Sequence, residues 1–163
     1  MRFGYWMPVF GGWLRNVPDE RMSIDWDYVR ALVQESEAGG FDLSLIAELN
    51  LNDIKGHRAP SLDAWTLGPA VAAVTERLEL MLAVRPNYHA PALTAKAVST
   101  LDVIAPGRVS LNVVSSWWKD EAAQYGAPFD VHDARYARTE EWLQAVGRLL
   151  REPVVDHHGA HYR

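Results

Sequence analysis

The chain has 163 residues, enough for one ordinary domain, and its 48% hydrophobic and 23% charged residues are typical of a globular protein that buries a core. Its formal net charge of −5, with no cluster of lysines and arginines, argues against a nucleic-acid partner. Cysteine is absent, which excludes disulfides and thiolate catalysis, and without a signal-peptide pattern or an apolar run of roughly 18 residues we expect a cytoplasmic protein that does not enter a membrane.

Short apolar runs that end at proline or glycine predict strands, and longer stretches with one apolar face predict helices. In chain order the sequence predicts strand Arg2–Met7, helix Asp25–Ala38, strand Phe41–Ile46, helix Ser61–Thr75, strand Leu78–Val84, helix Pro91–Ile104, strand Val109–Val114, a short helix Trp118–Tyr125 and helix Asp133–Arg151. Ser61 is the expected N-cap of the second helix. The tail, Val154–Tyr162, is expected to form a hairpin around His158–Gly159.

The strand–helix alternation predicts an α/β fold across residues 1–163, because strands without polar alternation are typical of a parallel sheet covered by helices. Two architectures fit this pattern. One is a doubly wound open sheet, and the other is a (β/α)8 TIM-type barrel of which only the first four βα units are present. No glycine-rich fingerprint follows the first strand, so a Rossmann dinucleotide site is not supported.

Four segments, in order and at consistent spacing, resemble the N-terminal half of the bacterial luciferase-like flavin-dependent monooxygenases, and within them the alkanesulfonate and dimethylsulfone monooxygenase group. Pyrimidine monooxygenases share much of the same pattern. Leu82–Pro86 resembles the third barrel strand of that family, and Leu101–Ser115 the approach to its fourth strand and the strand itself. His132–Tyr136 resembles the segment that opens the next long helix, and His158–Arg163 the hairpin before the fifth strand.

The resemblance implies a TIM barrel about twice the length of this chain. It implies an FMNH2- and O2-dependent monooxygenase of a small organosulfur substrate, acting through a C4a-peroxyflavin, with reduced FMN supplied by a separate NAD(P)H-dependent flavin reductase. It also implies a non-proline cis peptide near Ala83–Val84. The chemistry of such an enzyme belongs to the cofactor, so the residues expected to matter are those that bind and orient it, and no catalytic base is assigned.

The active site of a TIM barrel lies at the carboxyl ends of its strands, and this rule holds whichever family the barrel belongs to. It selects the stretches 6–10, 47–50, 84–89 and 112–118. By resemblance, the residues expected to bind the flavin are Asn112, Glu121, Arg135, Tyr136, Glu48 and Leu49. All of them except Leu49 have an alternative interpretation: a buried amide for Asn112, a solvated charge for Glu121 and Glu48, and a surface arginine beside a packed tyrosine for Arg135 and Tyr136.

Two further residues are candidates for the substrate site. Arg85 could bind a sulfonate or another anion, or could form an ion pair with a nearby carboxylate. Trp6 could line the substrate pocket, or could belong to the core. His157, His158 and His161 lie close together in the tail, but they form no recognised zinc pattern, and we predict no metal site.

In a sheet of four βα units, the first and last strands each have one edge without a partner strand. Such edges can pair with another chain. We therefore expect that the chain comes from a longer protein, forms a homo-oligomer or is marginally stable. Two alternatives to the monooxygenase remain open. One is another luciferase-like oxidoreductase that uses a flavin or a deazaflavin, and the other is a half-barrel without catalysis that acts as a binding or assembly module.

Overall fold

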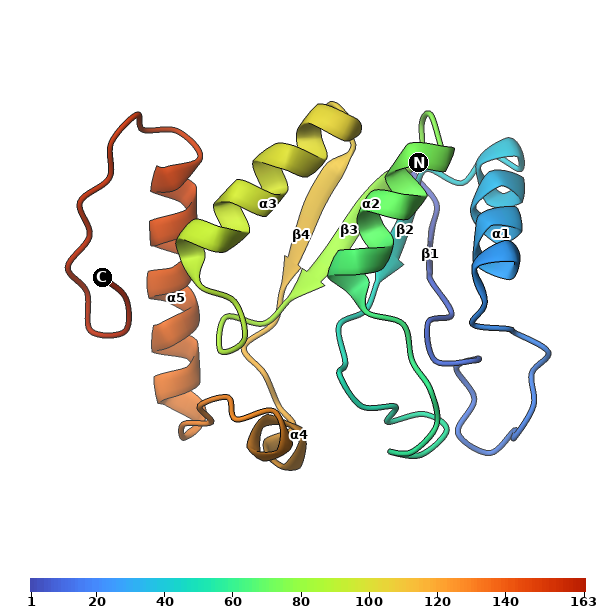
Figure 1. The fold of residues 1–163 in the computed structure, drawn as a ribbon, viewed down its shortest axis with the longest axis horizontal. Coiled ribbons are helices and arrows are strands. Elements are labelled where there is room, and N and C mark those ends of the chain that lie inside the picture. Colours follow the sequence, from blue (N-terminus) through green and yellow to red (C-terminus); the bar gives the residue numbers. More distant parts are fainter. The chain divides into compact units, whose positions relative to one another are not determined.

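The computed structural model describes residues 1–163. The strands and helices predicted before the tail are all present, most of them with ends shifted by a few residues. The elements, in chain order, are β1 (Gly4–Trp6), α1 (Trp26–Ala38), β2 (Leu43–Ile46), α2 (Ala64–Val74), β3 (Glu79–Val84), α3 (Pro91–Ile104), β4 (Val109–Val113), α4 (Lys119–Gln124) and α5 (His132–Leu149). Figure 1 labels these elements along the ribbon.

The four strands form one parallel sheet in the order β1-β2-β3-β4. β1 pairs with β2 so that Tyr5 lies opposite Ser44, and β2 pairs with β3 so that Ser44 lies opposite Leu80. A doubly wound sheet reverses its strand order at a switch point, whereas every strand here neighbours the next one along the chain. The sheet therefore has the order of a barrel-type fold.

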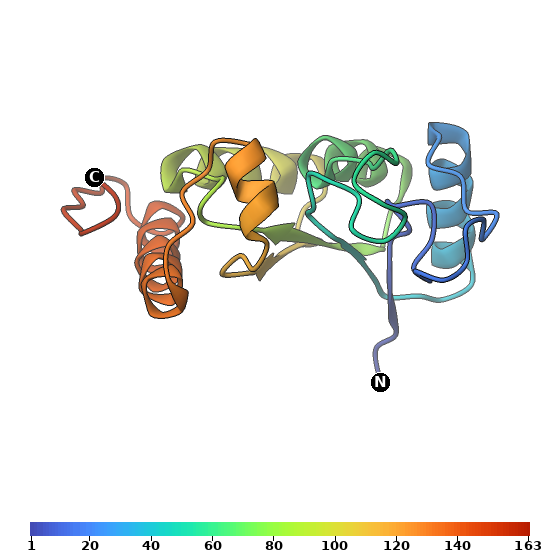
Figure 2. The same ribbon diagram turned by 90° about the horizontal axis from the view of Figure 1, so that it is seen from below.

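The chain divides into two compact units, of which the first holds most of the sheet. It contains residues 1–83 and 104–112, with α1 and α2. Helix α2 lies over β2 and β3, as Figures 1 and 2 both show, and Gly68 allows this close approach. A Cβ atom at Gly68 would lie 2.8 Å from the side chain of Leu82, which is fully buried on β3.

Two charged side chains of the first unit hydrogen-bond to the backbone of the loop between α2 and β3 and of the last turn of α2. The carboxylate of Glu37, near the end of α1, accepts hydrogen bonds from the backbone N–H groups of residues 76–78 just before β3. The guanidinium of Arg108 donates to the carbonyl oxygens of Ala72 and Leu78 at 3.0 and 3.1 Å. It thus satisfies a carbonyl in the last turn of α2, where a cation is favoured.

The second unit contains residues 84–103 and 113–163, with most of α3, with α4 and α5, and with the tail. Trp142 of α5 is fully buried, and its indole Nε1 donates to the carbonyl of His89 at 2.8 Å. Burial of a large aromatic side chain with its polar atom satisfied anchors α5 to the loop after β3.

Three local expectations were wrong. Asp63, not Ser61, caps α2: its carboxylate accepts from the backbone N–H of Thr66 at 2.6 Å. The tail after α5 contains no strand and makes an irregular turn, closed by a hydrogen bond from Gly159 N to the carbonyl of Tyr162 at 3.0 Å. The peptide bonds at Ala83–Val84 and elsewhere are all trans.

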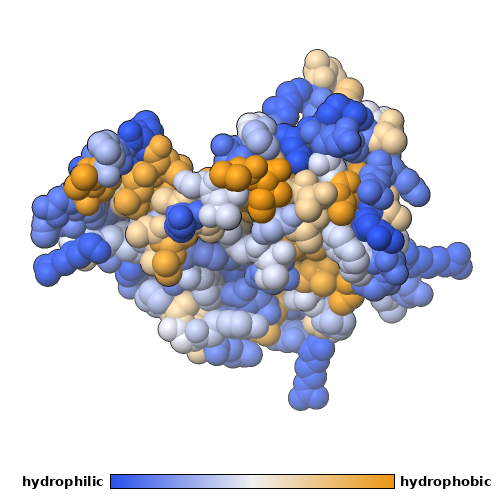
Figure 3. Space-filling view, turned by 45° about the horizontal axis from the view of Figure 1, so that its top comes forward, coloured by the Kyte–Doolittle hydropathy of each residue, from blue (hydrophilic) through white to orange (hydrophobic).

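The face drawn in Figure 3 carries both hydrophilic and hydrophobic patches. On α3, Leu93 and Val103 are 74% and 80% exposed. None of the helices combines the length and hydrophobicity that a bilayer span requires.

Candidate functional site

Four of the predicted site residues belong to the first unit, where they follow or end strands of the sheet. Trp6 ends β1, Glu48 and Leu49 follow β2, and Asn112 lies near the end of β4. Because the strands are parallel, these positions share the carboxyl edge of the sheet. The fold thus brings them to one edge although they are more than 100 residues apart in sequence.

Their exposure differs in a way that bears on ligand binding. Trp6 is 55% exposed and packs edge to face against Trp13, with ring centroids 5.3 Å apart. Glu48 is buried, which rules out a solvated charge there, while Leu49 and Asn112 are half-buried. The edge therefore presents an exposed indole and a half-accessible amide, which suit the flat face and the polar rim of a heteroaromatic ring.

In the second unit, Arg85 and Glu121 form a buried ion pair. Arg85 Nη1 lies against Glu121 Oε2, and Nη2 lies 3.3 Å from Oε1, so the guanidinium meets both carboxylate oxygens. Tyr88 completes the cluster, because its hydroxyl donates to Glu121 Oε2 at 3.2 Å and its ring lies 4.4 Å from Arg85 Cζ. Arg85 thus engages a carboxylate, one of the two roles that the sequence left open.

Arg135 and Tyr136 lie in the first turns of α5. The N-cap residue Val131 has no side-chain acceptor, so the N–H groups at the start of this helix have no side-chain cap. Arg135 stacks over Phe129 at 4.6 Å and donates from Nη1 to the carbonyl of Asp130 at 2.9 Å, but its buried Nε has no hydrogen-bond partner. Tyr136 is 56% exposed. An arginine, a phenol and an uncapped helix start are the donors that a phosphate group accepts from.

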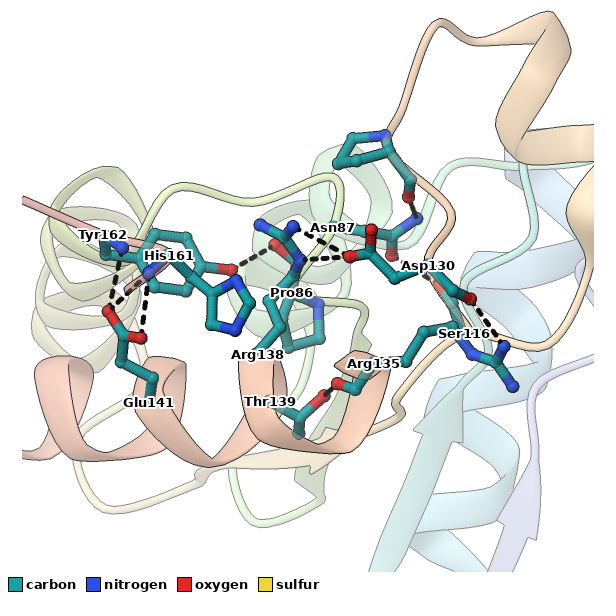
Figure 4. A network of polar contacts seen from close by, with 11 residues as sticks. Pro86, Asn87, Ser116, Asp130, Arg135, Arg138, Thr139, Glu141, His161 and Tyr162 are labelled. Carbon is teal, nitrogen blue, oxygen red and sulfur yellow. Dashed lines mark hydrogen bonds and ion pairs between the residues drawn. The ribbon is translucent and has the colours of Figure 1, made fainter. Parts of the chain in front are cut away.

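A small cavity of about 10 Å³, room for one water molecule, lies beside Arg135. The residues around it come from the loops after β3 and β4, from the loop between α4 and α5, and from α5 itself. They include Asn87, Ser116, Asp130 and Arg138 (Figure 4). Ser116 has a left-handed backbone (φ 56°) and donates its hydroxyl to Asn87 Oδ1. Sequence reasoning did not find this cluster, since its members share no spacing pattern.

The tail is held on α5 by one carboxylate, also drawn in Figure 4. Glu141 accepts from the backbone N–H groups of His161 and Tyr162 at 3.0 and 2.8 Å, and from His157 at 3.1 Å. Burial opposes the charge of Glu141, but these donors outweigh it, so the pKa of the carboxyl lies below its ordinary value. Tyr162 in turn donates its hydroxyl to the carbonyl of Pro86 at 2.9 Å.

No group of three or more histidine, cysteine, aspartate or glutamate side chains is placed to hold a metal ion. The histidines of the tail instead pair with carboxylates, His157 with Glu141 and His158 with Asp156 at 2.9 Å.

Comparison with known proteins shows where this arrangement occurs. The chain is 36% identical over its full length to an FMNH2-dependent dimethylsulfone monooxygenase of Pseudomonas putida, and 30% identical over 99% of its length to the pyrimidine monooxygenase RutA of Caulobacter segnis. It covers 45% and 47% of those two proteins, so it spans about half the length of the curated relatives that it matches.

Among solved structures, it superposes over its full length on 45% of the riboflavin lyase RcaE, which was crystallised with modified FMN and riboflavin, with a TM-score of 0.82 and 25% identity. The family model of the luciferase-like monooxygenases matches residues 1–163. The chain therefore belongs to the luciferase-like monooxygenase family.

Proposed function

We propose that this chain is the N-terminal half of an FMNH2- and O2-dependent monooxygenase that oxygenates a small organosulfur compound. The observation that carries the proposal is the match of the whole chain to 45% of the dimethylsulfone monooxygenase of Pseudomonas putida, at 36% identity. In such a two-component system, a separate NAD(P)H-dependent flavin reductase supplies the reduced flavin, and O2 is the second substrate.

The residues present fit this cofactor. In the second unit, the guanidinium of Arg135, the exposed side chain of Tyr136 and the uncapped start of α5 match a phosphate monoester. Asn112 would hydrogen-bond the polar edge of the flavin ring, and Glu48, Leu49 and Glu121 would complete its surroundings. When bound, reduced FMN supplies the electrons that activate oxygen, and the protein binds the ring, orients the substrate and excludes water.

The first test is an anaerobic titration of the 163-residue chain with reduced FMN, with oxidised FMN and a reduced deazaflavin as comparisons. Saturable binding that prefers reduced FMN supports the proposal. Preference for the deazaflavin would replace it with a different oxidoreductase of the same fold. A folded chain that binds none of the three would favour the binding or assembly module.

The second test concerns the substrate, because a pyrimidine monooxygenase is also among the relatives. The complete protein, supplied with a flavin reductase, NADH and 18O2, would be given dimethylsulfone and uracil in separate reactions. We expect 18O-labelled product from the sulfone alone, measured by mass spectrometry. Label in the uracil product alone would overturn the organosulfur assignment and leave the monooxygenase standing.

A further inference from the structure

Helix α3 exposes large hydrophobic side chains on the face that it turns away from the core. Ala95 and Leu101 are among its buried residues. On its other side, Leu93 and Val103 are 74% and 80% exposed, and Ile104 is 45% exposed. A single exposed apolar side chain needs no explanation, but three on one helix indicate a contact surface.

The exposed residues follow the spacing of one side of an α-helix. Leu93, Ala97, Thr100 and Ile104 succeed one another at intervals of four, three and four positions, and all four are exposed. Val103 borders this line, and together the five residues form the α3 stripe. Small side chains lie at its centre and large apolar ones at its two ends.

Helix α1 shows how a face that meets only water is composed. It exposes Asp27, Arg30, Gln34 and Glu35, the polar side chains expected there. Lys96, by contrast, is the only charged residue that borders the α3 stripe, since the spacing places the remaining charged residue of the helix on another side. Depletion of charge distinguishes the core of a protein interface from ordinary surface.

The order of side chains along the stripe fits a second copy of the same helix. If two copies lie antiparallel about a two-fold axis between Ala97 and Thr100, each Leu93 lies opposite Ile104 of the other copy. The small residues Ala97 and Thr100 then lie opposite each other, which lets the helices approach closely. One patch serves both copies, as an isologous contact requires.

Charge selects the antiparallel direction over the parallel one. In a parallel pair, the two Lys96 side chains would lie side by side and repel each other. In the antiparallel pair, each Lys96 lies near the last turn of the other helix, where carbonyl groups favour a cation.

We propose that the α3 stripe is the contact surface of an antiparallel, two-fold symmetric dimer of this chain. Its 14 residues make α3 about 21 Å long, so one helix pair buries less than the roughly 800 Å² per partner of a standard interface. The dimer is therefore weak and forms at high protein concentration. It does not depend on the binding of flavin.

The first test is disulfide crosslinking, which the absence of natural cysteines makes specific. Leu93→Cys and a mass-tagged Ile104→Cys chain are mixed and mildly oxidised. We expect the mixed dimer in several-fold excess over either homodimer, because antiparallel pairing holds the two positions 93 about 16 Å apart along the axis, beyond the reach of a disulfide. Ala31→Cys, at an exposed alanine of α1, gives the background yield.

The second test is sedimentation equilibrium of Ala97→Glu, which brings two carboxylates together at the axis. We expect its dissociation constant to rise about tenfold or more, whereas the matched control Ala31→Glu on α1 should leave it unchanged. Thermal unfolding of every variant checks that it is folded, and this pair of variants still tests the surface if a cysteine variant does not fold.

Homodimers of Leu93→Cys in excess over the mixed dimer would overturn the antiparallel arrangement. Equal association of Ala97→Glu and Ala31→Glu would place the contact elsewhere, such as an edge of the sheet, and would overturn the proposal. So would crosslinking no higher than that of Ala31→Cys. None of these outcomes changes the flavin titration, so the proposed function is tested separately.

Discussion

At the scale of single residues, Asn52 shows how one amide can hold a loop. Its side chain is buried and donates to the carbonyls of Phe10 and Pro60 at 3.0 and 2.8 Å. Its oxygen accepts from the backbone N–H groups of Ile54 and Lys55 at 3.0 and 2.7 Å. All four bonds go to backbone groups of irregular segments. The Asn52 amide thus satisfies N–H and carbonyl groups that a strand or helix would otherwise pair with other backbone groups.

Asn52→Ala should therefore destabilise the chain by roughly 2–4 kcal/mol, because several backbone groups lose their partner at once. Urea denaturation followed by circular dichroism measures the change. Asn16→Ala, at an exposed position, is the control and should stay within about 0.5 kcal/mol of the wild type. A loss at Asn52 no larger than that of the control would show that water replaces the amide.

Glu141 makes a pH-dependent contact with the tail. The pKa of this carboxyl is lowered from its ordinary 4.5, so its contribution to stability is fully present above pH 4.5 and is lost as the pH falls through the lower, folded-state pKa. The amide protons of His161 and Tyr162 should shift together in an NMR titration, with a midpoint below 4.5. Glu141→Gln should abolish this step, and Glu140→Gln at the exposed neighbour should preserve it. A midpoint at or above 4.5 would contradict the hydrogen-bonded geometry.

The limits of sequence reasoning are clearest at this scale. The stretch after each strand could be selected in advance, because barrel topology places it at the functional edge. The pairing of Arg85 with Glu121 could not, since the partners are 36 residues apart on separate elements and no periodicity relates them. Tyr88 and Asn87 lie within a selected stretch, but their contacts with Glu121 and Ser116 could not be predicted, because these contacts exist only after the loops have folded.

At the scale of elements, the start of α2 offers two candidate caps two residues apart. Both serine and aspartate can accept from the N–H groups of a first turn, and the prediction of Ser61 was wrong because the helix starts two residues later than expected, where Asp63 takes that role. The helix begins at Ala64, and the carboxylate of Asp63 makes the capping bond. Most other element bounds were predictable, because proline, glycine and apolar runs mark them directly.

Asp63→Ala should cost about 1 kcal/mol of unfolding free energy, whereas Ser61→Ala should change it by less than about 0.5 kcal/mol. Both are measured by urea denaturation under identical conditions. The pair is informative because the two residues are neighbours in one loop. A larger effect at Ser61 would place the helix start earlier than its observed position.

The tail was the one segment whose predicted type failed. A hairpin requires two strands that pair with each other, but the donors of residues 161 and 162 are used by Glu141 instead. A side chain from α5 thus takes the backbone groups that the hairpin ladder would have needed. The turn residues His158–Gly159 could not predict that a distant carboxylate would accept the hydrogen bonds of these N–H groups.

At the scale of the whole molecule, the outer edge of β4 governs how the chain behaves alone. The N–H of Leu80 bonds to Arg108 and the N–H of Val114 bonds to Val84, so even-numbered residues of β4 face β3. Because successive N–H groups of a strand point in opposite directions, that of Leu111 points away from β3. It is available for pairing with another chain.

We therefore predict that the 163-residue chain self-associates, which sedimentation velocity over a range of concentrations would detect. Leu111→Pro should weaken association, because it removes an outward donor, and should lower the melting temperature less than a proline whose missing donor faces β3. Ser110→Pro is the contrast: its donor faces β3, so the melting temperature should fall. A monomer at every concentration would show that the edge is protected.

The order of the strands also has a consequence for synthesis. Successive strands begin 30 to 39 residues apart, and each pairs with the strand made just before it. A chain that emerges from the ribosome can therefore extend the sheet at one free edge, one βα unit at a time, and never has to separate strands that have already paired. Each step closes a loop of similar length and so carries a similar entropic cost, which suits assembly that keeps pace with translation.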